Sequence, residues 1–192
     1  LTTRNVLSTT AGATIYTLTG RTGYFFQSGM TIDADGSPHA YNPSDTGLDW
    51  LANAGSPGNW WGIVTDANGT PYIQRSTDPV PGYYVSATSL VNSAKVIKDP
   101  LRYVDSETIP FIALPNGKAQ GAKIGDYCVI YNKRNDTYCY AIYADAGPST
   151  HIGEASIKAA ELLGIPSSPR NGGQGGDVVY IVFPNSGAGQ GT

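Results

Sequence analysis

Hydrophobic and polar positions alternate most clearly in residues 127–131 and 137–143, which read Tyr-Cys-Val-Ile-Tyr and Thr-Tyr-Cys-Tyr-Ala-Ile-Tyr. A period of two places every second side chain on the same face of a β-strand. The polar residues 132–136 separate the two segments. The pattern therefore predicts an antiparallel hairpin whose turn lies at 132–136.

Shorter apolar runs predict more strands, each ended by turn-forming residues. The Thr-rich first twenty residues alternate weakly and indicate one or two strands. The aromatic run 24–26 leads through 29–34 into the Asp-Gly turn at 35–36. We expect the remaining strands at 61–65 and 72–74, as a hairpin around the turn 66–70, at 109–115 and at 177–183, with short strands and turns in 76–104.

One segment, 153–164, has the apolar spacing of a helix, and Gly164 and Pro166 follow it as stop signals. Ser156, or a residue just before it, could cap the start. Residues 37–60 are rich in Pro, Gly, Asn and Asp and predict a long ordered loop or a short helix inside a loop. Residues 172–176 predict a glycine-rich loop, and we expect about 185–192 to form a flexible tail.

Composition agrees with a mostly β protein. Gly (24), Pro (13) and Tyr (13) are abundant, whereas charged residues make up only 14% of the 192 residues. Helix surfaces need the straight-chain charged residues that are scarce here, while strands and turns suit Tyr, Thr, Val, Gly and Asn. We expect residues 1–192 to form a single domain rather than two very small ones.

Charge and apolar content exclude several partners. The net charge is −3 and no basic block occurs, so nucleic acid is not an expected partner. The acidic balance instead favours a cationic ligand, although weakly. No run of about 18 apolar residues exists, so no membrane span is expected. Low charge on a Thr-, Ser-, Gly- and Tyr-rich chain indicates a secreted, extracellular protein, and the start at Leu1 rather than Met means that a leader could already be missing. We expect a monomer.

The two cysteines, Cys128 and Cys139, lie on opposite arms of the predicted 127–143 hairpin. A disulfide between them requires Cα atoms within about 7 Å, and two buried free thiols are the alternative. No Cys-x-x-Cys motif occurs and only His39 and His151 are present, so neither a zinc site nor another cofactor is expected.

Two carboxylates flank the loop that follows the second hairpin arm. Asp145 comes at the end of the predicted strand, and Glu154 comes at the predicted helix start after a Gly-Pro loop. Glycoside hydrolysis uses one carboxylic acid to protonate the leaving oxygen and a second carboxylate to activate water or to attack. The alternative is structural, with Asp145 accepting bonds in a turn and Glu154 near the positive helix end. Ser156 has no apparent His/Asp relay and is not an expected nucleophile.

Residues 143–145, 152–156 (Ile-Gly-Glu-Ala-Ser) and 163–165 resemble the signature of the fungal-type chitosanases of glycoside hydrolase family 75. The segments 30–36, 109–115 and 177–183 are similar to further pieces of that family, so the likeness extends in patches over roughly 24–184. It implies that Asp145 and Glu154 are the two essential acids of an endo-acting, inverting chitosanase. Ala146-Gly147 and Gln27-Ser28 depart from the family pattern, and both departures bear on substrate contacts.

The segment from the strand through Glu154 to the helix is also similar to double-psi β-barrels, among them expansins, family 45 endoglucanases and lytic transglycosylases. We therefore expect a double-psi β-barrel-like fold with one short helix after the catalytic loop. The likeness implies that Glu154 is the general acid and Asp145 the general base, with the reverse assignment open.

Six further residues are candidates for substrate binding. Asp33 and Asp35 could bind glucosamine ammonium groups, with an Asx turn as the alternative and no metal expected, because the full calcium-loop pattern is absent. Aromatic rings of Tyr41, Trp60 and Trp61 could stack on sugars, or pack beneath the long loop. His151 lies between the two acids and could tune them, or could simply face solvent.

Two other functions compete with the chitosanase. One is a cellulose- or peptidoglycan-cleaving enzyme on the same barrel, which a neutral aromatic groove would favour for cellulose. The other is a non-catalytic, expansin-like carbohydrate-binding protein, which would have one acid without a useful partner.

Overall fold

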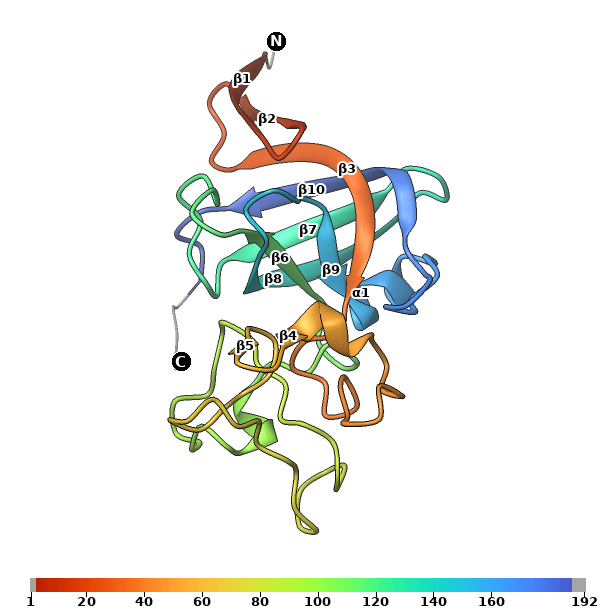
Figure 1. Ribbon diagram of the computed structural model, residues 1–192. Helices are drawn as coiled ribbons and strands as arrows, with labels where there is room; N and C mark the ends of the chain where they lie inside the picture. Colours follow the sequence, from red (N-terminus) through yellow and green to blue (C-terminus); the bar gives the residue numbers. More distant parts are fainter. Residues whose placement is uncertain (1–2, 188–192) are drawn as a thin grey trace.

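The computed structural model describes residues 3–187, and its central feature is a closed barrel of six strands (Figure 1). Around the barrel the strands follow the order β3-β10-β7-β8-β6-β9, and β9 pairs with β3 to close it. These strands are β3 (Tyr24–Asp33), β6 (Phe111–Pro115), β7 (Tyr127–Asn132), β8 (Thr137–Gly147), β9 (Glu154–Ser156) and β10 (Gln174–Phe183).

Two parallel pairings, β3 with β9 and β6 with β8, interrupt an otherwise antiparallel barrel. Antiparallel ladders join β10 to β3 and β7, β7 to β8, and β6 to β9. This arrangement confirms the mostly β fold and is consistent with the expected double-psi-like single domain.

The barrel interior holds the hydrophobic core. Ile32, Ala155 and Ile112 are register partners on β3, β9 and β6, and all three are buried. Phe26 stacks on Tyr180 at the centre, with ring centroids 4.8 Å apart. The neighbouring positions on β3, β9 and β6 point to the other side of the wall, because successive side chains of a strand alternate.

That other side is covered by residues 34–110, a segment hereafter called the loop layer, which Figure 1 shows below the barrel. Its regular elements are short: η1 (Leu51–Ala54), β4 (Gly55–Ser56), β5 (Asn59–Trp60) and η2 (Pro100–Arg102), η denoting a 3-10 helix. Side-chain and turn hydrogen bonds order the rest, such as Gln74 Nε2 donating to the Pro38 and Tyr84 carbonyls.

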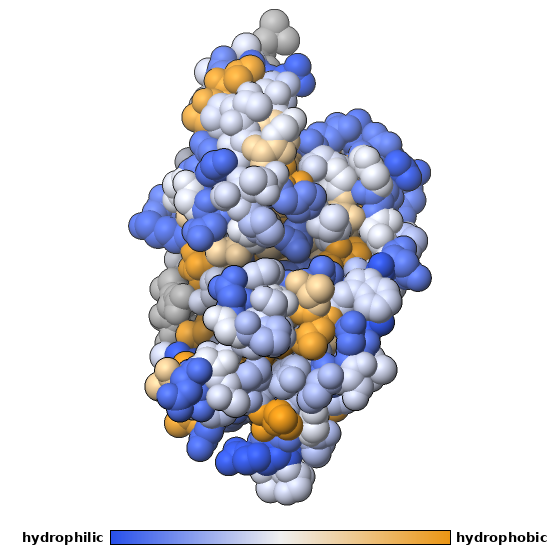
Figure 2. All heavy atoms as spheres, viewed as in Figure 1, coloured by the Kyte–Doolittle hydropathy of each residue, from blue (hydrophilic) through white to orange (hydrophobic). Residues whose placement is uncertain are grey.

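A separate hairpin, β1 (Arg4–Thr10) and β2 (Ala13–Leu18), extends the sheet from β3 at the N-terminal end. Figure 2 shows a hydrophobic patch over this hairpin, where Val6 and Leu7 are exposed. No helix in the described part of the chain is long and apolar enough to span a membrane.

Most predicted elements are present, and the differences have local causes. The 127–143 hairpin is confirmed as β7 and β8. The helix α1 covers only Ile157–Leu162, because residues 154–156 form β9 between β3 and β6. Ser156 caps α1 by accepting a bond from the Ala159 N–H, and Gly164 follows it with a positive φ of 64°.

Two other expectations are modified. The 61–74 hairpin is reduced to a single bridge, Thr65 to Pro71, because Ile63 and Ile73 instead bridge to Ser86 and Tyr84. The glycine-rich segment 172–176 already enters strand β10 at Gln174. Of the predicted tail, 188–192 lies outside the described residues.

The predicted disulfide does not form: Cys128 and Cys139 are buried free thiols. The β7–β8 register pairs Cys128 with Ala141 and Cys139 with Ile130, so the cysteines are diagonal rather than direct neighbours. Diagonal Cα atoms lie about 7–8 Å apart, beyond the usual range for a disulfide. Burial raises the thiol pKa of both, that of Cys139 to about 11.

Candidate active site

Strand register brings Asp145 and Glu154 to the same patch of barrel wall. Ala113 on β6 is the partner of Asp145 on β8 and also of Glu154 on β9. Register partners in a sheet project to the same face. The two carboxylates therefore stand on either side of Ala113 and face the loop layer.

A β-bulge sets the position of Asp145. The β6–β8 ladder pairs Ile112 with Tyr143 but Ala113 with Asp145, so Ala144 is the extra residue. Bulges re-aim the side chains that follow them. Here Tyr143 stays in the core while Asp145, two residues later, reaches the opposite side of the wall.

The spacing of strands sets the distance between the two acids. Neighbouring strands are about 4.8 Å apart, so two strand spacings put the Asp145 and Glu154 Cα atoms at about 10 Å, somewhat less across a curved wall. Both residues reach the same cleft, because both line its surface.

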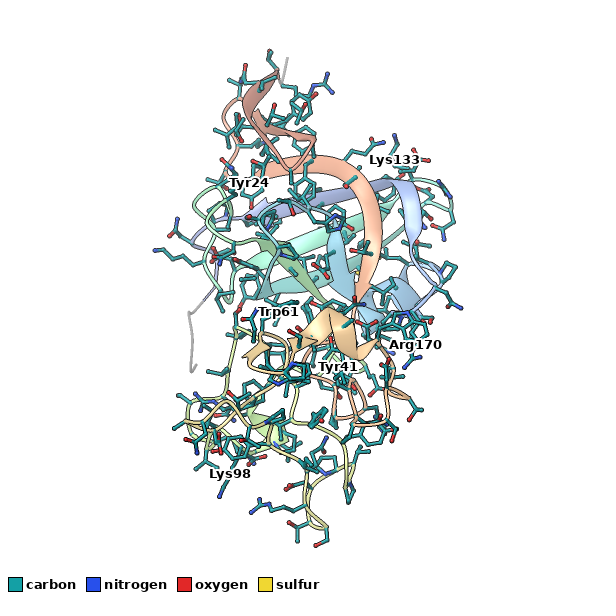
Figure 3. All side chains as sticks on the ribbon, in the orientation of Figure 1. Tyr24, Tyr41, Trp61, Lys98, Lys133 and Arg170 are labelled. Carbon is teal, nitrogen blue, oxygen red and sulfur yellow. The ribbon has the colours of Figure 1, made fainter. Side chains whose placement is uncertain are left out.

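The cleft has a volume of about 760 Å³ and lies between the barrel wall and the loop layer. Figure 3 shows Tyr41, Trp61 and Arg170 at this junction, whereas Lys98 and Lys133 are far from it. Its charged or titratable lining residues are Asp33, Asp35, Tyr41, Asp49, Asp145, His151, Glu154 and Arg170.

Glu154 is the best candidate for a proton donor. Burial raises the pKa of its carboxyl to about 7, and the charges of Asp145 and Asp49 contribute. A carboxylic acid with such a pKa stays largely protonated in mildly acidic solution. Gly147 packs against it so closely that an added Cβ would lie 2.8 Å from Glu154 Oε2.

Asp145 has a more polar environment. Its Oδ1 accepts hydrogen bonds from the Ser89 backbone N–H at 2.8 Å and from the Ser89 hydroxyl at 2.7 Å. Burial raises the pKa of Asp145, and these bonds oppose the rise because they stabilise the ionised form. The two acids thus differ in the donors that stabilise their charge.

Asp33 and Asp35 lie beside Asp145, and ligand oxygens of the three carboxylates are within 4.8 Å of one another. Asp33 Oδ1 accepts a bond from the Asp35 N–H, which is the Asx turn named as the alternative to substrate binding, and Asp35 Oδ1 accepts one from the Tyr41 hydroxyl. Burial, together with the neighbouring carboxylates, raises the pKa of both. Such a group attracts a cation that can share its charge.

The remaining predicted binding residues separate into two sets. Trp61 and His151 line the cleft; Trp61 is 63% exposed, and His151 Nε2 is 3.0 Å from Thr31 Oγ1. Tyr41 also lines it, but its ring is buried. Trp60 is not among the cleft residues and packs toward Tyr84, with ring centroids 6.3 Å apart.

Sequence reasoning missed Ser89, Asp49 and Arg170. Ser89 and Asp49 belong to the loop layer, whose fold no periodic pattern predicts. Arg170 lies over the Trp50 ring at 3.9 Å and donates to the Asp45 and Asp49 carbonyls. In the sequence, the signal that could have pointed to Arg170 was its position between the predicted helix and the glycine-rich segment.

A cleft that holds two buried carboxyl groups, one of them bonded by the Ser89 donors, has the pair of groups that glycoside hydrolases use. Residues 30–192 match the family described as fungal chitosanase of glycosyl hydrolase group 75, and the chain belongs to this family. It is accordingly a glycoside hydrolase that acts on the polysaccharide chitosan. A search of curated proteins found no match.

Proposed function

We propose that the protein cleaves β-1,4 glucosamine links within chitosan chains by inversion, with Glu154 as general acid and Asp145 as general base. The observation that carries this proposal is the contrast between the two acids in one cleft. Glu154 has a pKa of about 7, whereas Asp145 accepts two hydrogen bonds that favour its ionised form.

In the proposed reaction Glu154 donates its proton to the glycosidic oxygen as the bond to the anomeric carbon breaks. Asp145 accepts a proton from a water molecule, whose oxygen bonds to the anomeric carbon from the opposite face. The products are a shortened chain with a new reducing end and a chain with a new hydroxyl. Glu154 ends ionised and Asp145 protonated, and exchange with solvent restores both.

The placement of the acids on either side of β6 supports inversion. Inverting enzymes separate their carboxyl groups by about 6.5–9.5 Å to leave room for water, and retaining enzymes by about 5–5.5 Å. Cα atoms separated by two strand spacings, about 10 Å, are compatible with the larger distance when the side chains lean toward a shared substrate.

The acidic lining supports glucosamine rather than a neutral sugar as the unit bound. Asp33 and Asp35 would receive ammonium groups, with Trp61 as the exposed ring that stacks on a sugar. An ammonium group beside these carboxylates would lower their raised pKa values, so substrate binding would release protons. We further propose that the protein is secreted and acts as a monomer.

The test is the release of reducing ends from soluble chitosan by the wild type and by Glu154→Gln. Glu161→Gln is the matched control, because Glu161 is exposed on α1 and pairs with Lys158 at 3.2 Å. Activity that is lost only in Glu154→Gln supports the acid role, and an α-configured product seen first by NMR supports inversion. Release from cellulose or peptidoglycan in place of chitosan would favour the alternative enzymes, and binding without release would favour an expansin-like protein.

A further inference from the structure

We infer that Ser89, in the loop layer, is a positioning residue for the hydrolysis: it fixes the orientation of the Asp145 carboxylate and holds it ready to accept a proton. Ser89 does not itself line the cleft. Its action on the reaction therefore passes through Asp145, and the inference rests on the proposed role of Asp145 as base.

The segment Thr88–Leu90 lies along the bulge in β8 and is bonded to it at successive positions. The Leu90 N–H donates to the carbonyl of Ala144, the bulge residue, at 2.8 Å. The Ser89 N–H and hydroxyl both donate to Asp145 Oδ1, and the Ala146 N–H donates to Ser89 Oγ at 3.2 Å. Three consecutive residues of β8 are thus held by two residues of the loop layer.

This segment is itself anchored. Thr88 is buried, and its hydroxyl donates to the Leu90 carbonyl at 2.8 Å while accepting the Val104 N–H at 3.0 Å. A serine on an anchored segment adds little conformational entropy cost when it bonds a carboxylate. Ser89 therefore acts as a fixed pair of donors rather than as a mobile surface hydroxyl.

Two donors on one oxygen affect both the orientation and the protonation of the Asp145 carboxylate. They fix its rotation, because both bonds converge on Oδ1, and they favour the ionised form. The titratable groups that face Asp145 are Asp33, Asp35 and Glu154, with Tyr143 on its own strand. With these acidic neighbours on several sides, the two Ser89 donors and the Ala146 backbone N–H favour the ionised form of Asp145 that a base requires, against the burial that raises its pKa.

The direct test compares Ser89→Ala with the wild type over the pH profile of kcat and KM on chitosan oligomers. Loss of a hydrogen bond to a charged group corresponds to roughly a 10- to 100-fold change in rate. The kcat of Ser89→Ala should therefore fall by that factor, while its KM stays within about twofold of the wild type. The acidic limb of kcat/KM should move to higher pH, because Asp145 loses a donor that favours its ionised form.

A pair of isosteric variants separates the hydroxyl from packing. Ser89→Thr keeps the hydroxyl and should retain most of kcat, whereas Ser89→Val has the same shape without it and should behave like Ser89→Ala. Ser37→Ala is the matched control, a buried serine of the loop layer whose hydroxyl bonds to Glu107 outside the cleft, and it should keep the wild-type pH profile.

Asp145→Asn, measured in parallel, distinguishes failure of the Ser89 positioning role from failure of the proposed base. If Asp145→Asn is inactive but Ser89→Ala and Ser89→Val keep wild-type kcat and pH profile, the positioning role is overturned and the proposed base stands. If Asp145→Asn remains fully active, the base assignment fails, and the Ser89 proposal fails with it. Equal losses in the Thr and Val variants would assign Ser89 to packing and likewise overturn the inference.

Discussion

Glu154→Gln should make the protein more stable above neutral pH while leaving its stability nearly unchanged near pH 4. The folded pKa of Glu154, about 7, lies above its ordinary value of 4.5, chiefly because the carboxyl is buried. A raised pKa means that the protonated form is the one the fold accommodates. The fold therefore loses stability as pH rises from the ordinary value to the folded one, because over this range the unfolded chain releases the Glu154 proton while the folded chain keeps it.

The magnitude follows from the difference between the two pKa values, 7 − 4.5 = 2.5. At about 1.36 kcal/mol per unit, full ionisation costs about 3 kcal/mol of unfolding free energy. Glutamine has nearly the same shape and cannot ionise, so the variant avoids this cost. For a chain of this length the difference corresponds to a melting temperature roughly 6–12 °C higher than that of the wild type near pH 8.

The assay is thermal unfolding of wild type and Glu154→Gln at intervals from about pH 4 to about pH 8, with Glu161→Gln as a control on the exposed face of α1. The quantity of interest is the difference in melting temperature, which should be small at the acidic end and should grow through pH 5–7. A difference that stays constant across the range, or that shrinks as pH rises, would refute the reasoning that burial raises the pKa of Glu154. Equal growth in the Glu161 control would refute it as well.

Three other substitutions test separate parts of the site. Gly147→Ala should lower kcat by roughly 10-fold or more without unfolding the protein, because the added Cβ would lie 2.8 Å from Glu154 Oε2. The control Gly175→Ala has nothing within 4 Å of its added Cβ and should keep full activity. Equal kcat in both variants would contradict the placement of Glu154 against Gly147. Trp61→Ala should raise KM for chitosan oligomers about 2- to 10-fold with an unchanged melting temperature, because the ring is 63% exposed in the cleft, and an unchanged KM would remove it from substrate binding. Asp49→Asn should move the basic limb of the kcat/KM profile to lower pH, since the Asp49 charge raises the pKa of Glu154; a limb that stays in place would show that this charge does not act on the acid.

The barrel strands could be predicted from the sequence because their patterns are local. The 127–143 hairpin has alternating apolar positions on both arms, and the last strand is a run of β-branched and aromatic residues. Ser156 was predicted as a cap of α1 and is confirmed, but strand β9 just before it was not predicted, because residues 154–156 carry no strand pattern of their own. Three residues become a strand only when β3 and β6 lie on both sides of them, which is a tertiary effect.

The cleft residues divide along the same line. Asp145 and Glu154 could be proposed because they flank a short loop and resemble a family signature, whereas Ser89 and Asp49 sit in the loop layer among residues with no period. Trp60 and Trp61 are adjacent and chemically identical, so the sequence cannot tell which one faces the cleft. The disulfide prediction was wrong for a related reason. Whether Cys128 and Cys139 can be bonded depends on a two-residue offset in strand register, which the sequence does not show.

The closure of the barrel has a consequence for how the chain folds. β3 ends at Asp33, yet its barrel neighbours β9 and β10 begin at Glu154 and Gln174. Contacts between such distant segments have a high loop-closure cost and slow the folding of all-β proteins to milliseconds or seconds. During synthesis β3 can pair early with the β1–β2 hairpin, whereas its pairings with β9 and β10 must wait until residues 154–183 have left the ribosome. Because Glu154 arrives on one of those late strands, hydrolytic activity should appear only when the final closure has taken place.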